Sequence, residues 1–218
     1  YADQIVLSDD AWRRVKPFKN VDHPVIDYLN GDEIIRIVNA TEPDFRPLVQ
    51  AAIYTGCRYG ELTSLRVSDY NPDMKIIQIR KSKNGKARPV VLNDEAQVFF
   101  DNTVIPNKKS EDLMFSRPDG SIWGKSHQTR RLKDASKNGK IGRSISFHVL
   151  RHTHASQLAM QGVPMAVIAK QLGNSVKICE KHYAHLSPDY VADTIREHLP
   201  KFGISGETNV RAIKRKKA

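Results

Sequence analysis

The sequence predicts a mostly α-helical domain that carries one small antiparallel β-sheet, an α+β fold. Two observations predict it. Segments with helix start and stop signals fill most of the chain, and one pair of β-prone segments flanks an Asn-Gly turn. A hydrophobic content of 39% over 218 residues is enough for one large domain with a core. No run of about 18 apolar residues occurs, so we expect no membrane-spanning helix.

The helices are recognised by their ends. The segment 31–40 carries Asp32 and Glu33 in its first turn, where they suit the positive end of a helix dipole. A second helix is expected over DFRPLVQAAIYTG and ends at Gly56. A short third helix is expected to begin in RYGELTSL. The stretch 148–161 stops at Gly162, and Pro164 opens the next helix, where a missing N–H costs least. Further helices are expected at 94–104, 125–137, 176–186 and 188–199.

The β-sheet is predicted from one hairpin. MKIIQIR at 74–80 and ARPVVL at 87–92 are rich in β-branched residues, and KSKNGK lies between them. The dipeptide Asn84-Gly85 accepts the positive φ angles that a type I′ turn requires. We therefore expect two antiparallel strands joined by a lysine-rich turn.

The net charge of the chain indicates the chemical class of molecule that it binds. The chain has 35 Lys and Arg against 24 Asp and Glu, a net charge of +11. A domain this basic is typical of proteins that bind polyanions, and nucleic acid is the first candidate, although a basic surface kept for solubility is the alternative. The only cysteines, Cys57 and Cys179, do not indicate a disulfide framework, and they favour a reducing cytoplasm.

The stretch SFHVLRHTHAS places His148, Arg151, His152 and His154 in what otherwise reads as a packing helix. His148 and Arg151 share a helix face. His148 and His152 have the spacing of a zinc pair, but Val149 stands where a zincin helix has Glu, and no well-spaced acidic ligand follows. Histidines that fill polar gaps in the core are a better interpretation than zinc.

A phosphodiester substrate explains more of the residues. Two fixed guanidiniums can bridge the charged oxygens of the transition state, while His can move a proton near neutral pH. A metal-free phosphoryl-transfer site also needs a donor to the leaving oxygen and a nucleophile. The chain offers such a set: Arg58, Lys83, His148, Arg151 and Tyr183.

Four ordered segments carry a family resemblance. The four segments, in order, are AIYTGCRYGELTSLRVSDY, KSKNGKARPVVL, FHVLRHTHASQLAMQGVPMAVIAKQLGNS and EKHYAHLS. Over about residues 31–190 the chain resembles successive boxes of the tyrosine recombinase (phage integrase) family. The resemblance implies the catalytic-domain fold of DNA breaking-rejoining enzymes. It also implies a site-specific recombinase or integrase that cleaves and rejoins DNA through a 3′-phosphotyrosyl intermediate.

The resemblance assigns a role to each member of the set. Arg58 and Arg151 would grip the scissile phosphate, and Tyr183 would attack phosphorus. His148 would assist proton transfer around the attacking phenol, and Lys83 would protonate the leaving 5′-oxygen. The phosphotyrosyl link conserves the bond energy, so the strand can be rejoined without ATP. No metal and no cofactor is expected.

Three further residues complete the expected site. Glu61 matches the acidic position that supports the family's site by fixing Arg or His, and His152 is read as a structural hydrogen bonder. Asn174 departs from the pattern, since the family usually has His or Trp there. Its amide can donate a hydrogen bond but cannot carry a proton. His154 likewise stands where an aromatic residue is more usual.

Some assignments have rivals within the chain. Tyr59 is the alternative nucleophile, read instead as a core or supporting residue, and Lys86 is the alternative to Lys83. His182 and His185 flank the tyrosine and are read as surface, with His185 a possible local helper. Basic residues predicted to contact DNA are Lys86, Arg130, Arg131 and Lys133. A solvated surface explains this group almost as well.

The resemblance also predicts the organisation of the whole protein. Residues 1–30 are expected to be a linker from an N-terminal core-binding domain outside this sequence, 31–200 the catalytic domain, and 201–218 a basic tail. Partners would be double-stranded DNA, three further copies in a tetramer on two DNA sites, and accessory DNA-bending or directionality proteins, in the cytoplasm with the nucleoid. The rival functions are a type IB topoisomerase and a catalytically weak DNA-binding protein; a metallohydrolase is more distant.

Overall fold

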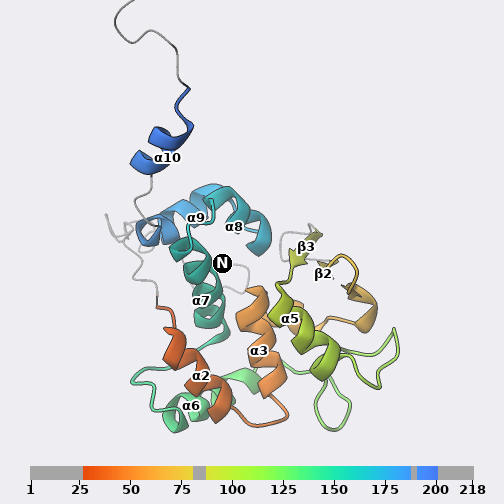
Figure 1. Ribbon diagram of the computed structural model, residues 1–218. Helices are drawn as coiled ribbons and strands as arrows, with labels where there is room; N and C mark the ends of the chain where they lie inside the picture. Colours follow the sequence, from red (N-terminus) through yellow and green to blue (C-terminus); the bar gives the residue numbers. More distant parts are fainter. Residues whose placement is uncertain (1–26, 81–86, 188–190, 201–218) are drawn as a thin grey trace, which may run out of the picture.

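The computed structural model describes residues 27–80, 87–187 and 191–200 of the chain (Figure 1). Its α-helices are α2 (Gly31–Ala40), α3 (Arg46–Thr55), α4 (Tyr59–Thr63), α5 (Asp94–Phe99), α6 (His127–Asn138), α7 (Phe147–Met160), α8 (Met165–Leu172), α9 (Val176–Tyr183) and α10 (Val191–His198). The strands are β1 (Tyr70–Asn71), β2 (Ile76–Ile79) and β3 (Arg88–Val91). Short 3₁₀ turns span Val67–Asp69 and Ala184–Leu186, and Phe100–Val104 is a π-helical turn that extends α5. The predicted fold class is confirmed.

The helix ends follow the local signals in the sequence. Asn30 caps α2 through a capping box with Glu33: each side chain accepts the other residue's backbone N–H, at 2.9 and 3.0 Å. Helix α3 ends at Gly56, which has φ +62°. A Cβ there would lie 2.6 Å from Cδ2 of His154, so glycine is required both for the turn and for the close packing.

The sheet has three strands in the order β1–β2–β3, all antiparallel. Ile77 faces Val90 across the predicted hairpin, and Ile79 faces Arg88. The sequence predicts only the hairpin and misses β1, which pairs Tyr70 with Ile77. A strand of two residues is too short to show an alternating pattern of its own, so only its pairing defines it.

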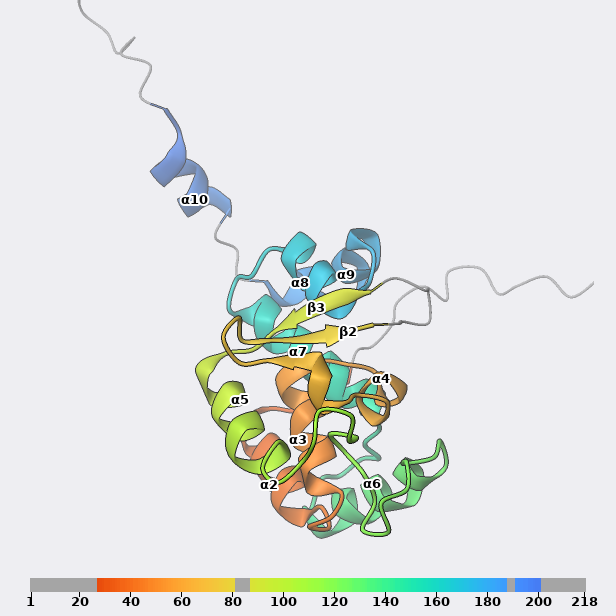
Figure 2. The ribbon, with the colours of Figure 1, turned by 90° about the vertical axis from the view of Figure 1, so that its right-hand side faces the viewer.

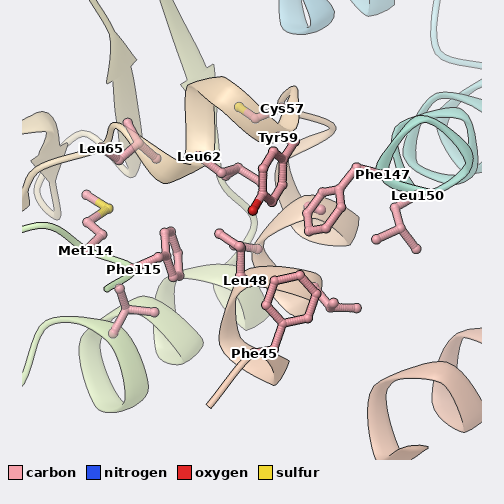
Figure 3. Packing of buried hydrophobic residues seen from close by; sticks show 14 of the residues in the cluster. Phe45, Leu48, Cys57, Tyr59, Leu62, Leu65, Met114, Phe115, Phe147 and Leu150 are labelled. Carbon is pink, nitrogen blue, oxygen red and sulfur yellow. The ribbon is translucent and has the colours of Figure 1, made fainter. Parts of the chain in front are cut away.

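The larger hydrophobic core lies among α2, α3, α4, α7 and the sheet. Phe45, Tyr59 and Phe147 pack edge to face in it, with ring centroids of Tyr59 and Phe147 4.7 Å apart (Figure 3). Tyr59 is buried here, and its hydroxyl donates to the carbonyl oxygen of Gly124 at 2.9 Å. This side chain therefore serves the core, as the sequence analysis preferred.

Helix α7 connects this core to a second, smaller one. Its first half contributes Phe147 and Leu150 to the large cluster, and its second half contributes Ala155 and Ala159 to a cluster with α8 and α9. Figures 1 and 2 show α7 at the centre, with α8 and α9 over one end and α2, α3 and α6 toward the other. Arg151 lies on α7 where the two clusters meet.

The structure describes the two ends of the chain only in part. Helix α10 matches part of the predicted 188–199 helix and stands away from the other helices in both ribbon views (Figures 1 and 2). Most of the predicted 1–30 linker and all of the 201–218 tail lie outside the described residues. Within the described part of the chain, no helix is long and apolar enough to cross a membrane.

Candidate active site

Arg58 stands immediately before α4, with an extended backbone that leads from Gly56 into the helix. Its backbone N–H donates to Oε2 of Glu61 at 2.9 Å, and its guanidinium Nη1 donates to Oε1 at 2.9 Å. One carboxylate thus fixes both the backbone and the side chain of Arg58. The side chain keeps 32% of its surface exposed, so it remains available to a ligand.

Glu61 is shared between two arginines. Its carboxylate also accepts two hydrogen bonds from Arg88, Nη1 to Oε1 at 3.0 Å and Nη2 to Oε2 at 2.8 Å. Burial alone would raise the pKa of Glu61, but hydrogen bonds from Arg88 and Arg58 and the charge of Arg88 lower it to about 2. Glu61 is therefore ionised at neutral pH and holds Arg58 in one orientation.

Arg88 is a site residue that the sequence analysis missed. It is buried, and its Nε donates to the carbonyl oxygen of Gln171 at 3.1 Å, so it ties β3 to the end of α8. The sequence held one signal: in the predicted strand 87–92, Arg88 alternates onto the same face as the apolar Val90 and Leu92, and the structure buries that face. A charged residue on the inward face of a strand requires a buried partner.

Arg151 is held by the ends of two helices. Only 3% exposed, it donates from Nη1 to the carbonyl oxygen of Gly56 at 2.7 Å and from Nη2 to that of Leu172 at 2.8 Å. These carbonyls end α3 and α8, where the helix dipole is negative. Burial, and then the charge of Arg58, lowers the pKa of Arg151 to about 10, which still leaves it protonated at neutral pH.

Asn174 joins the two predicted phosphate-binding arginines. Its Oδ1 accepts from Nη2 of Arg58 at 3.1 Å and from Nη2 of Arg151 at 3.0 Å. The preceding Gly173 has φ +68°, and a Cβ there would lie 2.9 Å from Cδ of Arg88. The turn after α8 thus brings Asn174 in front of both guanidiniums, which converge on a single oxygen atom.

Tyr183 lies at the C-terminal end of α9 with only 2% of its surface exposed. Its hydroxyl oxygen is 2.7 Å from Nδ1 of His152, on α7. Burial raises the pKa of Tyr183 to about 12, against the lowering effect of the charge on Arg151. The predicted nucleophile therefore carries its proton at neutral pH and is bonded to His152, which the sequence analysis read as structural.

His148 lies one turn before His152 on α7. The two rings pack edge to face with centroids 4.4 Å apart. Burial first, then the charges of Arg151 and Arg58, lowers the pKa of His148. For His152, burial, His148, His182 and Arg151 lower the pKa to about 4. His148 is therefore the histidine whose pKa is lowered by the charges of both arginines, whereas His152 is hydrogen-bonded to Tyr183.

The residues predicted to contact DNA differ in their surroundings. The Arg130 side chain is 92% exposed on α6, and Lys133 on the same helix is also exposed. The guanidinium of Arg131 instead forms ion pairs with Glu42 and Asp44 and lies over the Trp123 ring, 4.9 Å from its centroid. Lys83 and Lys86 lie outside the described residues.

His154 and His185 lie near the site in sequence, but neither forms the hydrogen bond to Tyr183 that the structure describes. His154 Nδ1 bonds the carbonyl oxygen of Ile53 at 2.9 Å, which ties α7 to α3, and His185 is exposed. Zinc would need a third ligand beside His148 and His152. Among the described residues, no group of three His, Cys, Asp or Glu side chains is placed to hold a metal ion.

The arrangement of an arginine pair, two histidines and a buried tyrosine on this fold defines a class, the catalytic domains of tyrosine recombinases. The chain belongs to the phage integrase family, whose model matches residues 27–189. Structure comparison agrees: the XerA recombinase crystal structure matches with a TM-score of 0.63 and 26% identity, covering 86% of this chain and 68% of that one. The catalytic domain of bacteriophage HP1 integrase matches in fold with a TM-score of 0.62 and 23% identity, covering 84% of this chain and 99% of that one.

Curated relatives carry related names. Tyrosine recombinase XerA of Saccharolobus solfataricus is 28% identical over 186 residues, which is 85% of this chain and 60% of the relative. The integrase of Salmonella phage P22 is 27% identical over 192 residues, 83% of this chain and 49% of the relative. The chain thus spans about half to three fifths of the length of these two relatives.

Proposed function

We propose that this chain is the catalytic domain of a site-specific DNA recombinase or integrase, which cleaves and rejoins strands through a 3′-phosphotyrosyl intermediate. The observation that carries the proposal is the meeting of Arg58 and Arg151 at the Oδ1 atom of Asn174. Two guanidiniums that can bond one oxygen atom can also bond the oxygens of one phosphate. The membership of the family and the position of Tyr183 near Arg151 support the same conclusion.

In this reaction Arg58 and Arg151 bind the nonbridging oxygens of the scissile phosphate and stabilise the charge of the transition state. Tyr183 attacks phosphorus and displaces the 5′-oxygen, and Lys83 supplies the proton that this oxygen needs. His148, next to both arginines, assists proton transfer at the phosphate. Glu61 and Arg88 act as positioning residues for Arg58. The phosphorus–oxygen bond to Tyr183 replaces the one to the 5′-oxygen, so rejoining consumes no ATP.

Asn174 takes the place of the usual His or Trp. With its Oδ1 bonded to both arginines, its Nδ2 amide remains a donor for a phosphate oxygen. It supplies a hydrogen bond and no proton. We therefore propose that Asn174 binds the phosphate, and that proton transfer depends on the histidines of α7 and on Lys83.

DNA is the proposed substrate and partner, with the protein in the cytoplasm at the nucleoid. The net charge of +11 favours a polyanion. On α6, Arg130 and Lys133 are exposed and suited to backbone phosphates, whereas Arg131 already has two carboxylate partners. Lys86, beside the proposed acid Lys83 in the sequence, is a further proposed contact.

Assembly as a tetramer on two DNA sites is proposed together with docking of α10 on a neighbouring copy. An apolar groove of about 550 Å³ lies between α3, α7, α8 and the start of α5, with Tyr54, Leu92 and Val167 among its lining residues. Helix α10 exposes Ile195 and ends before exposed Leu199. A chain shortened to residue 187 should bind one DNA site but lose the tetramer in light scattering; an unchanged mass would contradict the docking. Accessory DNA-bending or directionality proteins are expected as further partners.

A nicked suicide substrate tests the chemistry, because loss of the short 5′ fragment traps the covalent adduct. The wild-type protein should form an adduct whose mass map names Tyr183, in the presence of EDTA, and Tyr183→Phe should form none. Attachment at Tyr59 would contradict the assignment of Tyr183 as the nucleophile, and the absence of any adduct would favour the weak DNA binder. Relaxation of a one-site plasmid without two-site recombination would favour the topoisomerase alternative.

A further inference from the structure

We propose that His152 is a catalytic residue: it takes the proton from the Tyr183 hydroxyl as the phenolate oxygen attacks phosphorus. This inference rests on the proposed function and reassigns one step of it. The proton role around the attacking phenol falls to the second histidine of the α7 pair, and His148 serves the phosphate.

The geometry points to His152 directly. Its Nδ1 lies 2.7 Å from the hydroxyl oxygen of Tyr183, within the distance over which a general base abstracts a proton. The two residues are on different helices, α7 and α9, so their contact depends on the packing of the tertiary structure. Among the described residues, the hydrogen bond to this hydroxyl is made by His152, and His148 lies behind it at 4.4 Å between ring centroids.

The protonation states suit this step. Burial lowers the pKa of His152 to about 4 and raises that of Tyr183 to about 12. At neutral pH the imidazole is therefore uncharged and has one nitrogen with a free lone pair, while the phenol holds its proton. Nδ1 accepts the phenol O–H when the imidazole proton is on Nε2. The pair rests as a neutral hydrogen bond and keeps Tyr183 from ionising before substrate arrives.

DNA binding changes the charges that face this pair. His152 meets His148 and Arg151 on α7 and His182 and Tyr183 on α9, with ring centroids of His152 and His182 6.1 Å apart. A phosphodiester bound at Arg151 brings negative charge that offsets the cation, so the pKa of His152 rises. The phenolate that forms lies near the same arginine, whose charge lowers the pKa of Tyr183.

The step balances. The O–H bond of Tyr183 breaks and its proton goes to Nδ1 of His152, while the phenolic oxygen forms a bond to phosphorus. The bond from phosphorus to the 5′-oxygen breaks, and that oxygen takes its proton from Lys83. In rejoining, the protonated His152 returns its proton to the departing phenolate.

The test compares single-turnover adduct formation on the nicked substrate for wild-type protein, His152→Gln and the control His127→Gln, which lies on α6 away from the tyrosine. Gln can still accept a hydrogen bond from Tyr183 but takes no proton, so positioning is separated from proton transfer. We expect His152→Gln to slow adduct formation by about 10²–10³-fold at pH 7. The deficit should narrow as pH rises to 9.5, because the small fraction of Tyr183 that is already a phenolate grows with pH and needs no base. His127→Gln, at a residue whose Nδ1 accepts from the backbone N–H of Gly124, should stay close to wild type.

A second substrate with sulfur in place of the bridging 5′-oxygen separates the two ends of the reaction. Its leaving group needs no proton, so Lys83→Ala should regain its rate while His152→Gln stays slow. Wild-type rates for His152→Gln at every pH would overturn the inference and leave the proposed function standing. A faster rate would also overturn it, since the bond would then only restrain Tyr183. Absence of a wild-type adduct would overturn both, and equal melting temperatures and DNA affinities exclude misfolding.

Discussion

The guanidiniums of Arg58 and Arg151 meet at one atom, the Oδ1 of Asn174, although the two residues lie 93 positions apart in the chain. The two hydrogen bonds measure 3.1 and 3.0 Å. Two like charges this close repel each other, so the oxygen between them stabilises the pair before any substrate binds. A phosphate oxygen placed at the same point would meet the same two donors.

The first prediction concerns this bridging oxygen. Asn174→Asp would place a carboxylate between Arg58 and Arg151, which should raise the melting temperature because the two cations gain a counter-charge. The same carboxylate should repel the scissile phosphate and reduce adduct formation by about 10²-fold or more. Asn174→His, which restores the residue usual in the family, is the control and should retain cleavage. If Asn174→Asp cleaved DNA at the wild-type rate, the two arginines would not be binding the phosphate at this position.

The second prediction concerns the ion pair beneath Arg58. Glu61→Gln leaves the buried Arg88 without a counter-charge, which should lower the free energy of unfolding by about 3–5 kcal/mol in urea titrations. The control is Glu95→Gln, because Glu95 is exposed and accepts one hydrogen bond from Tyr54 at 2.8 Å. A cost for Glu61→Gln no larger than that of the control would contradict the role of the pair.

The third prediction is the pH dependence of stability that Glu61 produces. Its pKa is about 2 in the folded chain against an ordinary value of 4.5. A folded pKa below the unfolded one stabilises the protein above about pH 4.5, and this stabilisation is lost as pH falls from 4.5 toward 2. Wild type should therefore lose its stability advantage over Glu61→Gln across this window, measured by urea unfolding at each pH. An advantage that is constant with pH would contradict it.

The fourth prediction separates two adjacent arginines of α6. Arg130→Ala should leave the melting temperature unchanged and reduce the salt dependence of DNA binding by about one phosphate contact. Arg131→Ala should lower the melting temperature, because its guanidinium pairs with Glu42 and Asp44 and packs on Trp123. Fluorescence anisotropy over a salt series measures the first effect. Identical behaviour of the two variants would contradict the assignment.

The fifth prediction tests the turn between α3 and α4. Gly56→Ala combines a positive φ with a Cβ 2.6 Å from His154 and 2.8 Å from Leu172, so it should cost about 2 kcal/mol or more. Gly60→Ala is the matched control inside α4, where a Cβ meets nothing within 4 Å. That change should stabilise the chain by up to about 1 kcal/mol. Thermal unfolding compares both, and equal effects would contradict the packing argument.

Local signals in the sequence were enough to predict most elements. Gly56 and the acidic start of α2 mark helix ends through backbone chemistry that neighbouring residues control, and the flanks of Asn84-Gly85 form the predicted hairpin. Helix limits shift by a residue or two, as for α7, predicted at 148–161 and found at 147–160. The strand β1 was missed because its partner, and not its own two residues, defines it.

Contacts between distant segments set the limit of the prediction for the site. The family pattern supplied Arg58, Arg151 and Tyr183 as candidates, but the bond between His152 and Tyr183 depends on how α7 crosses α9. The pairing of Arg88 with Glu61 similarly depends on how β3 meets α4. No spacing along the chain encodes either contact, so their partners emerged only in three dimensions.

The two helix ends that hold Arg151 have a practical consequence. Its bonds to Gly56 and Leu172 go to carbonyl oxygens that carry no net charge, so neither of these partners neutralises the guanidinium. A pair of guanidiniums does not distinguish the phosphate of a nucleic acid from a small tetrahedral oxyanion. Sulfate or inorganic phosphate in a buffer should therefore compete for the site more strongly than chloride at equal ionic strength, and the choice of assay salt will influence every rate that is measured.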